Sequence, residues 1–153
     1  MPFPDFEPCT PVFLRSLKER YASRDLIVYE GRRLTYAEAA SQSARLARGM
    51  LASGISKGSR LGLLMPNSPD FVVAWLAAAR SGAIIIPINT FYKPRELAFV
   101  LHHADIQVLL SADEPDLIHH ADAMPAVGSP DDAPASGGSG TWLTGALGAG
   151  ASW

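Results

Sequence analysis

Apolar side chains recur at helical spacing near the amino terminus and again after residue 35. Thr10-Pro11 is typical of an N-cap followed by a first-turn proline, and the next residues predict a helix with a buried face of Phe13, Leu14, Leu17 and Tyr21. The sequence Thr35-Tyr36-Ala37-Glu38 matches a capping box, in which each of the two end side chains bonds the other residue's amide. A second helix is therefore expected there, ended by Gly54, with a packing face of Tyr36, Ala40, Ala44, Ala47 and Leu51.

Short apolar runs between these helical patterns predict β-strands. Residues 26–29 and 33–35 flank a turn and predict a hairpin. Residues 60–65 and 83–88 lie on either side of an all-apolar helical segment, 71–79, and predict a βαβ unit with parallel strands. Because this helix has no polar face, we expect it to be covered on all sides.

The same alternation continues towards the carboxyl terminus. Pro94 opens a fourth predicted helix, and residues 107–110 predict another parallel strand; the helix face is Leu97, Val100, Leu101 and Ala104. Strands that alternate with helices indicate an α/β fold with a mainly parallel sheet flanked by helices. We expect one lobe over residues 1–124 and a flexible tail over 125–153, where 20 of 29 residues are Gly, Ala, Ser or Pro.

Charge is unevenly distributed along the chain. The net charge is −2, from 13 Lys and Arg against 15 Asp and Glu, but all 13 cations lie at or before Arg95. The segment after Arg95 therefore has no fixed cation with which to bind a phosphate. Neither part interleaves aromatic and basic residues as nucleic-acid binders do, so we expect no nucleic-acid partner.

Three features bear on location. The single cysteine, Cys9, cannot form an internal disulfide, which favours a reducing compartment. The first twenty residues lack the basic start and apolar run of a signal peptide. Arg80 and Gly82 interrupt the most apolar stretch, residues 71–88, so no membrane span is predicted. We therefore expect a cytoplasmic protein.

Two segments, Leu34–Ala39 (LTYAEA) and Ala79–Asn89 (ARSGAIIIPIN), resemble the first two core motifs of the adenylate-forming, AMP-binding superfamily. This superfamily includes acyl-CoA synthetases, luciferases and the adenylation domains of peptide synthetases. Residues 54–60 and 65–71 resemble the intervening part of the family's N-terminal lobe. The resemblance covers residues 10–112 and is greatest to fatty-acid and aromatic acyl-CoA synthetases.

The resemblance implies the N-terminal part of an acid–thiol ligase that converts a carboxylic acid, ATP and CoA to acyl-CoA, AMP and pyrophosphate. ATP, Mg and CoA are thus implied for the complete family enzyme. The family's phosphate-binding loop and catalytic lysine belong to segments beyond the resembling part, so no residue here inherits a catalytic role. We therefore expect this chain alone to be inactive and to bind none of these cofactors.

Two further patterns contain residue types that are found in ligand-binding sites, but a structural interpretation is favoured for each. Residues 136–141 (SGGSGT) resemble a phosphate loop, yet no lysine follows and no apolar strand precedes them. His102-His103-Ala104-Asp105, repeated at residues 119–122, carries zinc-ligand types, but the first copy lies on the polar side of a predicted helix. We predict no metal site.

Polar residues after the predicted parallel strands are the remaining candidates, because open α/β sheets bind ligands at the carboxyl ends of their strands. The candidate cofactor-binding residues are Asn67, Asn89, Thr90 and Tyr92, accompanied by Ser68, Ser111 and Asp113. A turn or cap role is the alternative for each.

Two other functions remain open at this point. The chain could be a non-catalytic interaction module, or one half of a split enzyme, whose exposed apolar surfaces need a complementary chain. A small independent nucleotide-binding domain rests on fold analogy alone.

Overall fold

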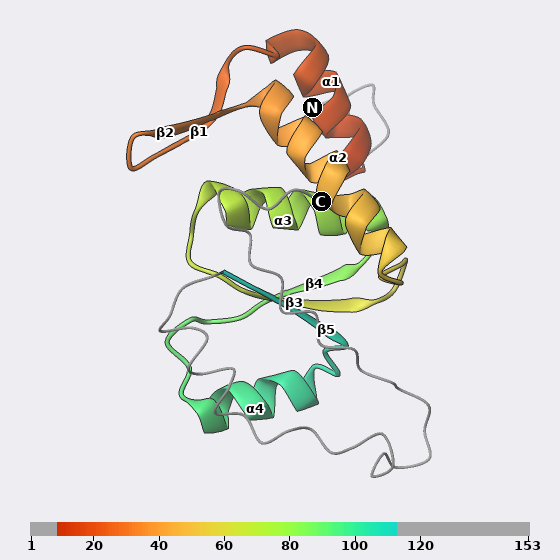
Figure 1. The fold of residues 1–153 in the computed structure, drawn as a ribbon, viewed down its shortest axis with the longest axis vertical. Coiled ribbons are helices and arrows are strands. Elements are labelled where there is room, and N and C mark those ends of the chain that lie inside the picture. The colour runs from red at the N-terminus through yellow and green to blue at the C-terminus, as the bar shows by residue number, and fades with distance from the viewer. Residues whose placement is uncertain (1–8, 113–153) are drawn as a thin grey trace, which may run out of the picture. The chain divides into compact units, whose positions relative to one another are not determined.

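The computed structural model describes residues 9–112, and its contacts divide the chain into two compact units (Figure 1). Among the described residues, the helical unit comprises 9–56 and 67–82, and the sheet unit comprises 57–66 and 83–112. The helical unit contains α1 (Thr10–Tyr21), β1 (Asp25–Tyr29), β2 (Arg32–Thr35), α2 (Tyr36–Ala52) and α3 (Pro69–Ser81). The sheet unit contains β3 (Arg60–Leu64), β4 (Ile84–Pro87), α4 (Pro94–His103) and β5 (Val108–Ser111).

Helix α1 packs against α2 and α3 through a narrower face than the sequence predicts. Leu14 is buried and Leu17 half-buried, but Phe13 and Tyr21 are exposed, so the predicted face is wrong at those two positions. Phe13 precedes Leu14 by one residue, which turns it about 100° away around the helix. The N-cap is also one residue earlier than predicted, at Cys9, whose side chain makes no capping bond.

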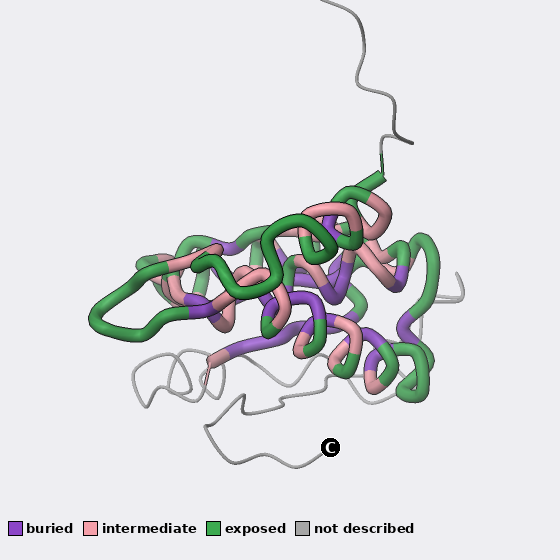
Figure 2. The backbone as a smooth tube through the Cα atoms, turned by 90° about the horizontal axis from the view of Figure 1, so that it is seen from above, coloured by how far each residue is buried: buried purple, intermediate pink, exposed green. Residues whose placement is uncertain are grey.

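Strands β1 and β2 form the predicted antiparallel hairpin, whose connecting end is exposed (Figure 2). Its turn has two residues, Glu30 and Gly31, both at positive φ (48° and 79°). Two such residues give the turn geometry that matches the twist of the flanking strands. The second strand, predicted to begin at residue 33, begins one residue earlier, because Arg32 already pairs with Tyr29.

Helix α2 begins with the predicted capping box. The amide of Glu38 donates to Thr35 Oγ1 (3.2 Å), and the amide of Thr35 donates to Glu38 Oε2 (2.9 Å). Gly54, at φ 88°, follows the helix end as expected. The buried face, however, consists of Ala39, Ala40, Ser43, Ala47 and Met50. Leu51 is 51% exposed, so the prediction placed the end of this face one residue too late.

Helix α3 begins and ends as its flanking residues predict. The Ser68 hydroxyl accepts a hydrogen bond from the amide of Phe71 (3.1 Å), and Gly82 at φ 75° adopts the left-handed conformation at the other end. Four of the apolar side chains are buried: Val73, Ala74, Ala77 and Ala78. Trp75 is 39% exposed and contacts the Phe71 ring instead, so the expectation that α3 is covered on all sides is wrong there.

The sheet unit has the predicted parallel sheet, with strand order β4-β3-β5. Helix α4 packs on one face of the sheet through a cluster of buried residues: Leu64, Ile88, Leu97, Leu101, Ile106 and Leu109. At the start of the central strand, Arg60 Nη1 pairs with Asp105 Oδ2 (2.6 Å), which joins β3 to the turn before β5. The unit is therefore an α/β arrangement, as the alternating pattern indicates.

Candidate functional site

The carboxyl ends of the three parallel strands lie at one edge of the sheet unit. Leu63 of β3 is paired with Pro87 of β4 and with Leu110 of β5, so the loops after these strands leave the sheet on the same side. After β4, this edge carries Asn89, Thr90 and Tyr92, while Ser111 ends β5. These candidates therefore share one edge, as the sequence predicts.

Asn89 closes the turn that follows β4. Its exposed side chain accepts a hydrogen bond from the amide of Phe91 (3.0 Å), and its carbonyl accepts one from the amide of Tyr92 (3.3 Å). This is the local bonding by which asparagine stabilises turns. Thr90 is half-buried within the same turn, and its neighbour Phe91 is 89% exposed.

Tyr92 lies where this turn meets α4. It packs against the buried cluster below α4 and lines an open depression of about 430 Å³ together with Arg95, Glu96, Phe99 and Val100. The Glu96 carboxylate accepts a hydrogen bond from the amide of Lys93 (2.8 Å) and so caps the helix. Sequence reasoning selected Tyr92 but missed Arg95 and Phe99, whose four-residue spacing places them on one helical face.

The remaining candidates at strand ends have other surroundings. Ser68 and Asn67 belong to the helical unit, where Ser68 caps α3 and Asn67 is exposed. Ser111 is buried. Asp113 lies outside the described residues.

The histidine pattern is only partly within the described residues. His103 stacks on Phe99, with ring centroids 5.3 Å apart and an interplanar angle of 9°, and Asp105 pairs with Arg60. Within residues 9–112, no three His, Cys, Asp or Glu side chains are placed to hold a metal ion. The second copy at 119–122 and the glycine-rich 136–141 lie outside that range.

The described edge does not fit magnesium-bound ATP by itself. Its side chains supply the Asn89 amide and the Glu96 carboxylate, which are already used in a turn and a helix cap, together with hydroxyl groups and the two cations Lys93 and Arg95. Magnesium requires oxygen ligands such as carboxylates, and a transferring phosphate requires several oriented donors. No catalytic step through ATP can therefore be built from these residues.

Comparison with known proteins agrees with the fold. The AMP-binding enzyme family model matches residues 14–140. The acyl-CoA ligase sidI of Aspergillus fumigatus is 39% identical over 98 residues, which cover 63% of this chain and 16% of the relative. The mitochondrial medium-chain acyl-CoA ligase ACSF2 of Danio rerio is 30% identical, over 72% of this chain and 19% of the relative.

Among solved structures, the fatty acyl CoA synthetase of Mycobacterium tuberculosis superposes with a TM-score of 0.76 at 29% identity. That match covers 90% of this chain and 26% of the synthetase. No helix within residues 9–112 is long and apolar enough to cross a membrane. The chain spans only a fifth or less of the two curated relatives' length, and its fold is that of the N-terminal part of adenylation domains. With the family model matched over residues 14–140, the chain belongs to the AMP-binding enzyme family.

Proposed function

We propose that this chain is the N-terminal scaffold of an ATP-dependent, AMP-forming acyl-CoA synthetase and is inactive as the 153-residue polypeptide. The observation that carries the proposal is the family match over residues 14–140 together with the small share of each relative that is covered. The complete enzyme would join a carboxylic acid to CoA with cleavage of ATP to AMP and pyrophosphate.

The expected inactivity follows from charge and donor placement. Phosphoryl and adenylyl transfer needs cations and oriented donors around the reacting phosphate. The sequence has no Lys or Arg after Arg95, and the described strand ends use Asn89 and Ser68 for turn and cap bonds. What this chain supplies is a folded sheet and helices on which further residues would build the nucleotide site.

Carboxylate-dependent exchange of labelled pyrophosphate into ATP tests this proposal. The purified 153-residue chain is assayed with medium-chain and long-chain fatty acids and with benzoate, beside a full-length relative as the positive control. We expect no exchange above the blank without enzyme. Exchange that requires both the chain and a carboxylic acid would overturn the proposed inactivity.

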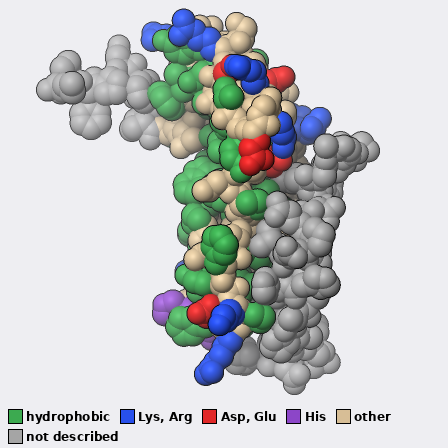
Figure 3. All heavy atoms as spheres, turned by 90° about the vertical axis from the view of Figure 1, so that its left-hand side faces the viewer, with side chains coloured by type: hydrophobic (Ala, Val, Ile, Leu, Met, Phe, Trp, Pro, Cys, Tyr) green, Lys and Arg blue, Asp and Glu red, His purple; other side chains and the backbone are tan. Residues whose placement is uncertain are grey.

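A second proposal is that the chain works as one half of a split enzyme. Large apolar side chains of the sheet unit are exposed, notably Phe91 at 89% and Phe99 at 66%, and hydrophobic side chains are visible at the surface in Figure 3. Exposed apolar groups of this size are typical of surfaces that a partner covers.

Mixing tests the split-enzyme proposal. The chain is combined with the separately produced remainder of a relative, from which the matched segment has been removed, and acyl-CoA formation is measured. We expect activity only in the mixture, and lower activity when Phe91→Ser and Phe99→Ser are both introduced. Phe13→Ser, at an exposed position of α1, is the control. Failure of the two chains to co-elute would contradict the proposal.

A further inference from the structure

The two outer strands of the parallel sheet, β4 and β5, differ in the backbone groups that they direct away from β3 (Figure 1). In β4, the amides of Ile84 and Ile88 donate to carbonyls on the β3 side (2.8 and 2.9 Å). Backbone groups of successive residues in a strand point to opposite sides, so Ile85 and Pro87 direct theirs away from β3.

Pro87 therefore occupies an outward-facing backbone position of β4. Proline has no N–H group, and a strand added along this side would lack a hydrogen bond there. Proline within a sheet is accordingly found on edge strands. The ends of β4 are also exposed: Ile84 is 50% exposed, and Pro87 is exposed. These features are typical of a strand that remains at the edge of its sheet.

Strand β5 has the opposite character. The amide of Gln107 donates to the Arg60 carbonyl (3.0 Å), so by the same alternation Val108 and Leu110 direct their backbone groups away from β3. The strand contains neither proline nor a charged residue, the usual protection of a natural edge. All four of its residues are buried, which is typical of an interior strand in a parallel sheet.

The sequence after β5 is poor in the residues that form such a sheet. Interior parallel strands are rich in Val, Ile and Leu, but only two of the 42 residues after Ser111 are Val or Ile. The two curated relatives described above have more than four-fifths of their length outside the matched part. A neighbouring strand for β5 is therefore more readily supplied by that remaining part than by this chain.

We propose that β5 is the edge at which the remaining part of an acyl-CoA synthetase adds a strand to this sheet, while β4 stays the outer edge. Main-chain bonds from Val108 and Leu110 would form the new ladder, as in other cases of strand addition. This inference rests on the proposed function, and it names the surface through which the scaffold joins the rest of the enzyme.

Amide hydrogen exchange of the 153-residue chain alone tests whether this edge is open. Leu109, whose backbone groups face β3, should exchange slowly. Val108 and Leu110 should exchange about tenfold faster or more, since their amides face outward. Slow exchange at all three residues would show that another segment of this chain already pairs with β5, and would overturn the proposal.

The same measurement is repeated after mixing with the remainder of a relative from which the matched segment has been removed. We expect exchange at Val108 and Leu110 to slow about tenfold or more, and exchange at Ile85 of β4 to stay unchanged. Absence of a complex, a complex without this protection, or protection of Ile85 in its place would each overturn the proposal.

Acyl-CoA formation in that mixture distinguishes this inference from the proposed functions. Protection of Val108 and Leu110 without activity would support the strand pairing and contradict the split-enzyme function. Activity without their protection would do the reverse. Pyrophosphate exchange by the chain alone would contradict only the proposed inactivity.

Proline substitutions at matched outward positions provide a second test. Val108→Pro removes an outward N–H of β5 and should weaken association with the remainder about tenfold or more. Ile85→Pro removes the corresponding N–H of β4 and should leave the affinity unchanged. Circular dichroism shows whether both variants fold; if Val108→Pro does not, exchange in the unsubstituted chain still decides. Equal affinity of two folded variants would overturn the proposal.

Discussion

A Cβ atom added at Gly62 would lie 2.8 Å from Cδ1 of Ile88. It would also lie 3.1 Å from Cδ1 of Leu109 and 3.2 Å from Cδ1 of Ile106. Gly62 occupies the middle of β3, the central strand of the parallel sheet. The missing side chain therefore lets the cluster under α4 pack directly onto the backbone of that strand.

Gly62→Val should consequently destabilise the chain, by about 1–3 kcal/mol, the usual cost of overpacking a core. Gly62→Ala should cost less, since the atoms it meets are the ends of side chains that can shift. Gly49→Ala is the matched control: it lies in α2 with nothing near its Cβ position, and should stabilise by about 0.5–1 kcal/mol. Urea unfolding measures all three. Wild-type stability in Gly62→Val would show that this packing is not tight.

Features that depend on a few neighbouring residues could be predicted from the sequence. The Thr35–Glu38 capping box and the glycine end of α3 need no distant contact, and both were confirmed. The alternation of apolar runs likewise predicted the three parallel strands to within a residue or two.

Orientation relative to other elements could not be predicted in the same way. On α2, a helical face through Met50 and one through Leu51 fit the apolar spacing about equally well, and packing against α1 and α3 selects Met50. The depression beside α4 could not be predicted from the apolar pattern. Arg95 and Phe99, which line it, lie on the opposite side of the helix from the buried Leu97 and Leu101. The roles of Asn67, Asn89, Thr90 and Tyr92 in binding stay predictions.

Ser68→Ala should destabilise the helical unit by about 1 kcal/mol, since it removes the acceptor for the Phe71 amide at the start of α3. Asn67→Ala, one residue earlier at an exposed position, is the control and should be within about 0.5 kcal/mol of wild type. Thermal unfolding followed by circular dichroism compares the two. Equal losses in both variants would mean that the Ser68 cap is not the cause.

Thr35→Ala should cost about 1 kcal/mol, because the Thr35 hydroxyl accepts from the amide of Glu38 at the start of α2. Thr35→Ser, which retains the hydroxyl, should restore most of this stability. Urea unfolding near neutral pH measures the difference. The cap would be shown to be unimportant if the alanine and serine variants unfolded together.

The same capping box makes stability depend on pH. Hydrogen bonds from the backbone and then the side chain of Thr35 lower the pKa of Glu38 below its ordinary 4.5. A carboxyl whose pKa is lower in the folded state stabilises the fold above its unfolded pKa, and this stabilisation is lost as the pH falls through the folded pKa. Wild type should therefore exceed Glu38→Gln in stability near neutral pH, and the difference should shrink at pH values below 4.5. A difference that stays constant on acidification would contradict this origin.

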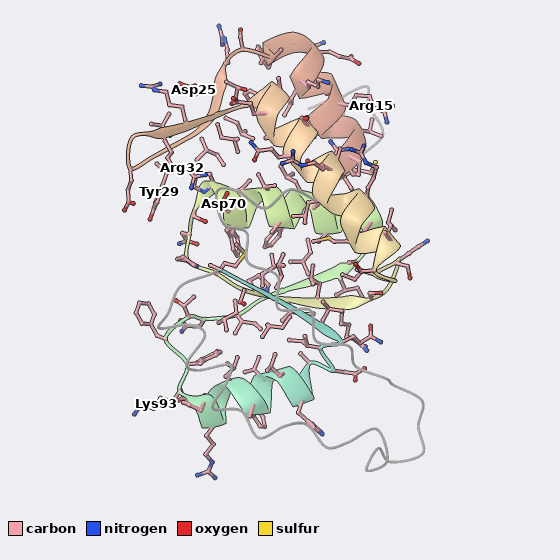
Figure 4. The ribbon with its side chains drawn as sticks, in the orientation of Figure 1. Arg15, Asp25, Tyr29, Arg32, Asp70 and Lys93 are labelled. Atoms are coloured by element: carbon pink, nitrogen blue, oxygen red, sulfur yellow. The ribbon has the colours of Figure 1, made fainter. Side chains whose placement is uncertain are left out.

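Arg32 at the start of β2 and Asp70 in the first turn of α3 point towards each other (Figure 4) and form two contacts, Nη1–Oδ2 at 3.1 Å and Nη2–Oδ1 at 3.4 Å. The hydrogen bond and the charge of Asp70 raise the pKa of Arg32, so the guanidinium keeps its positive charge at any ordinary pH. The Arg32 side chain is 62% exposed, and water screens such a pair, which limits its coupling energy to about 1 kcal/mol or less.

A double-mutant cycle with Arg32→Gln and Asp70→Asn measures that coupling, and added salt should reduce it further. Asp70 also lies near the positive end of the α3 dipole, so Asp70→Asn alone should cost more than Arg32→Gln alone. A coupling well above 1 kcal/mol that resists salt would show instead that the pair is shielded from solvent.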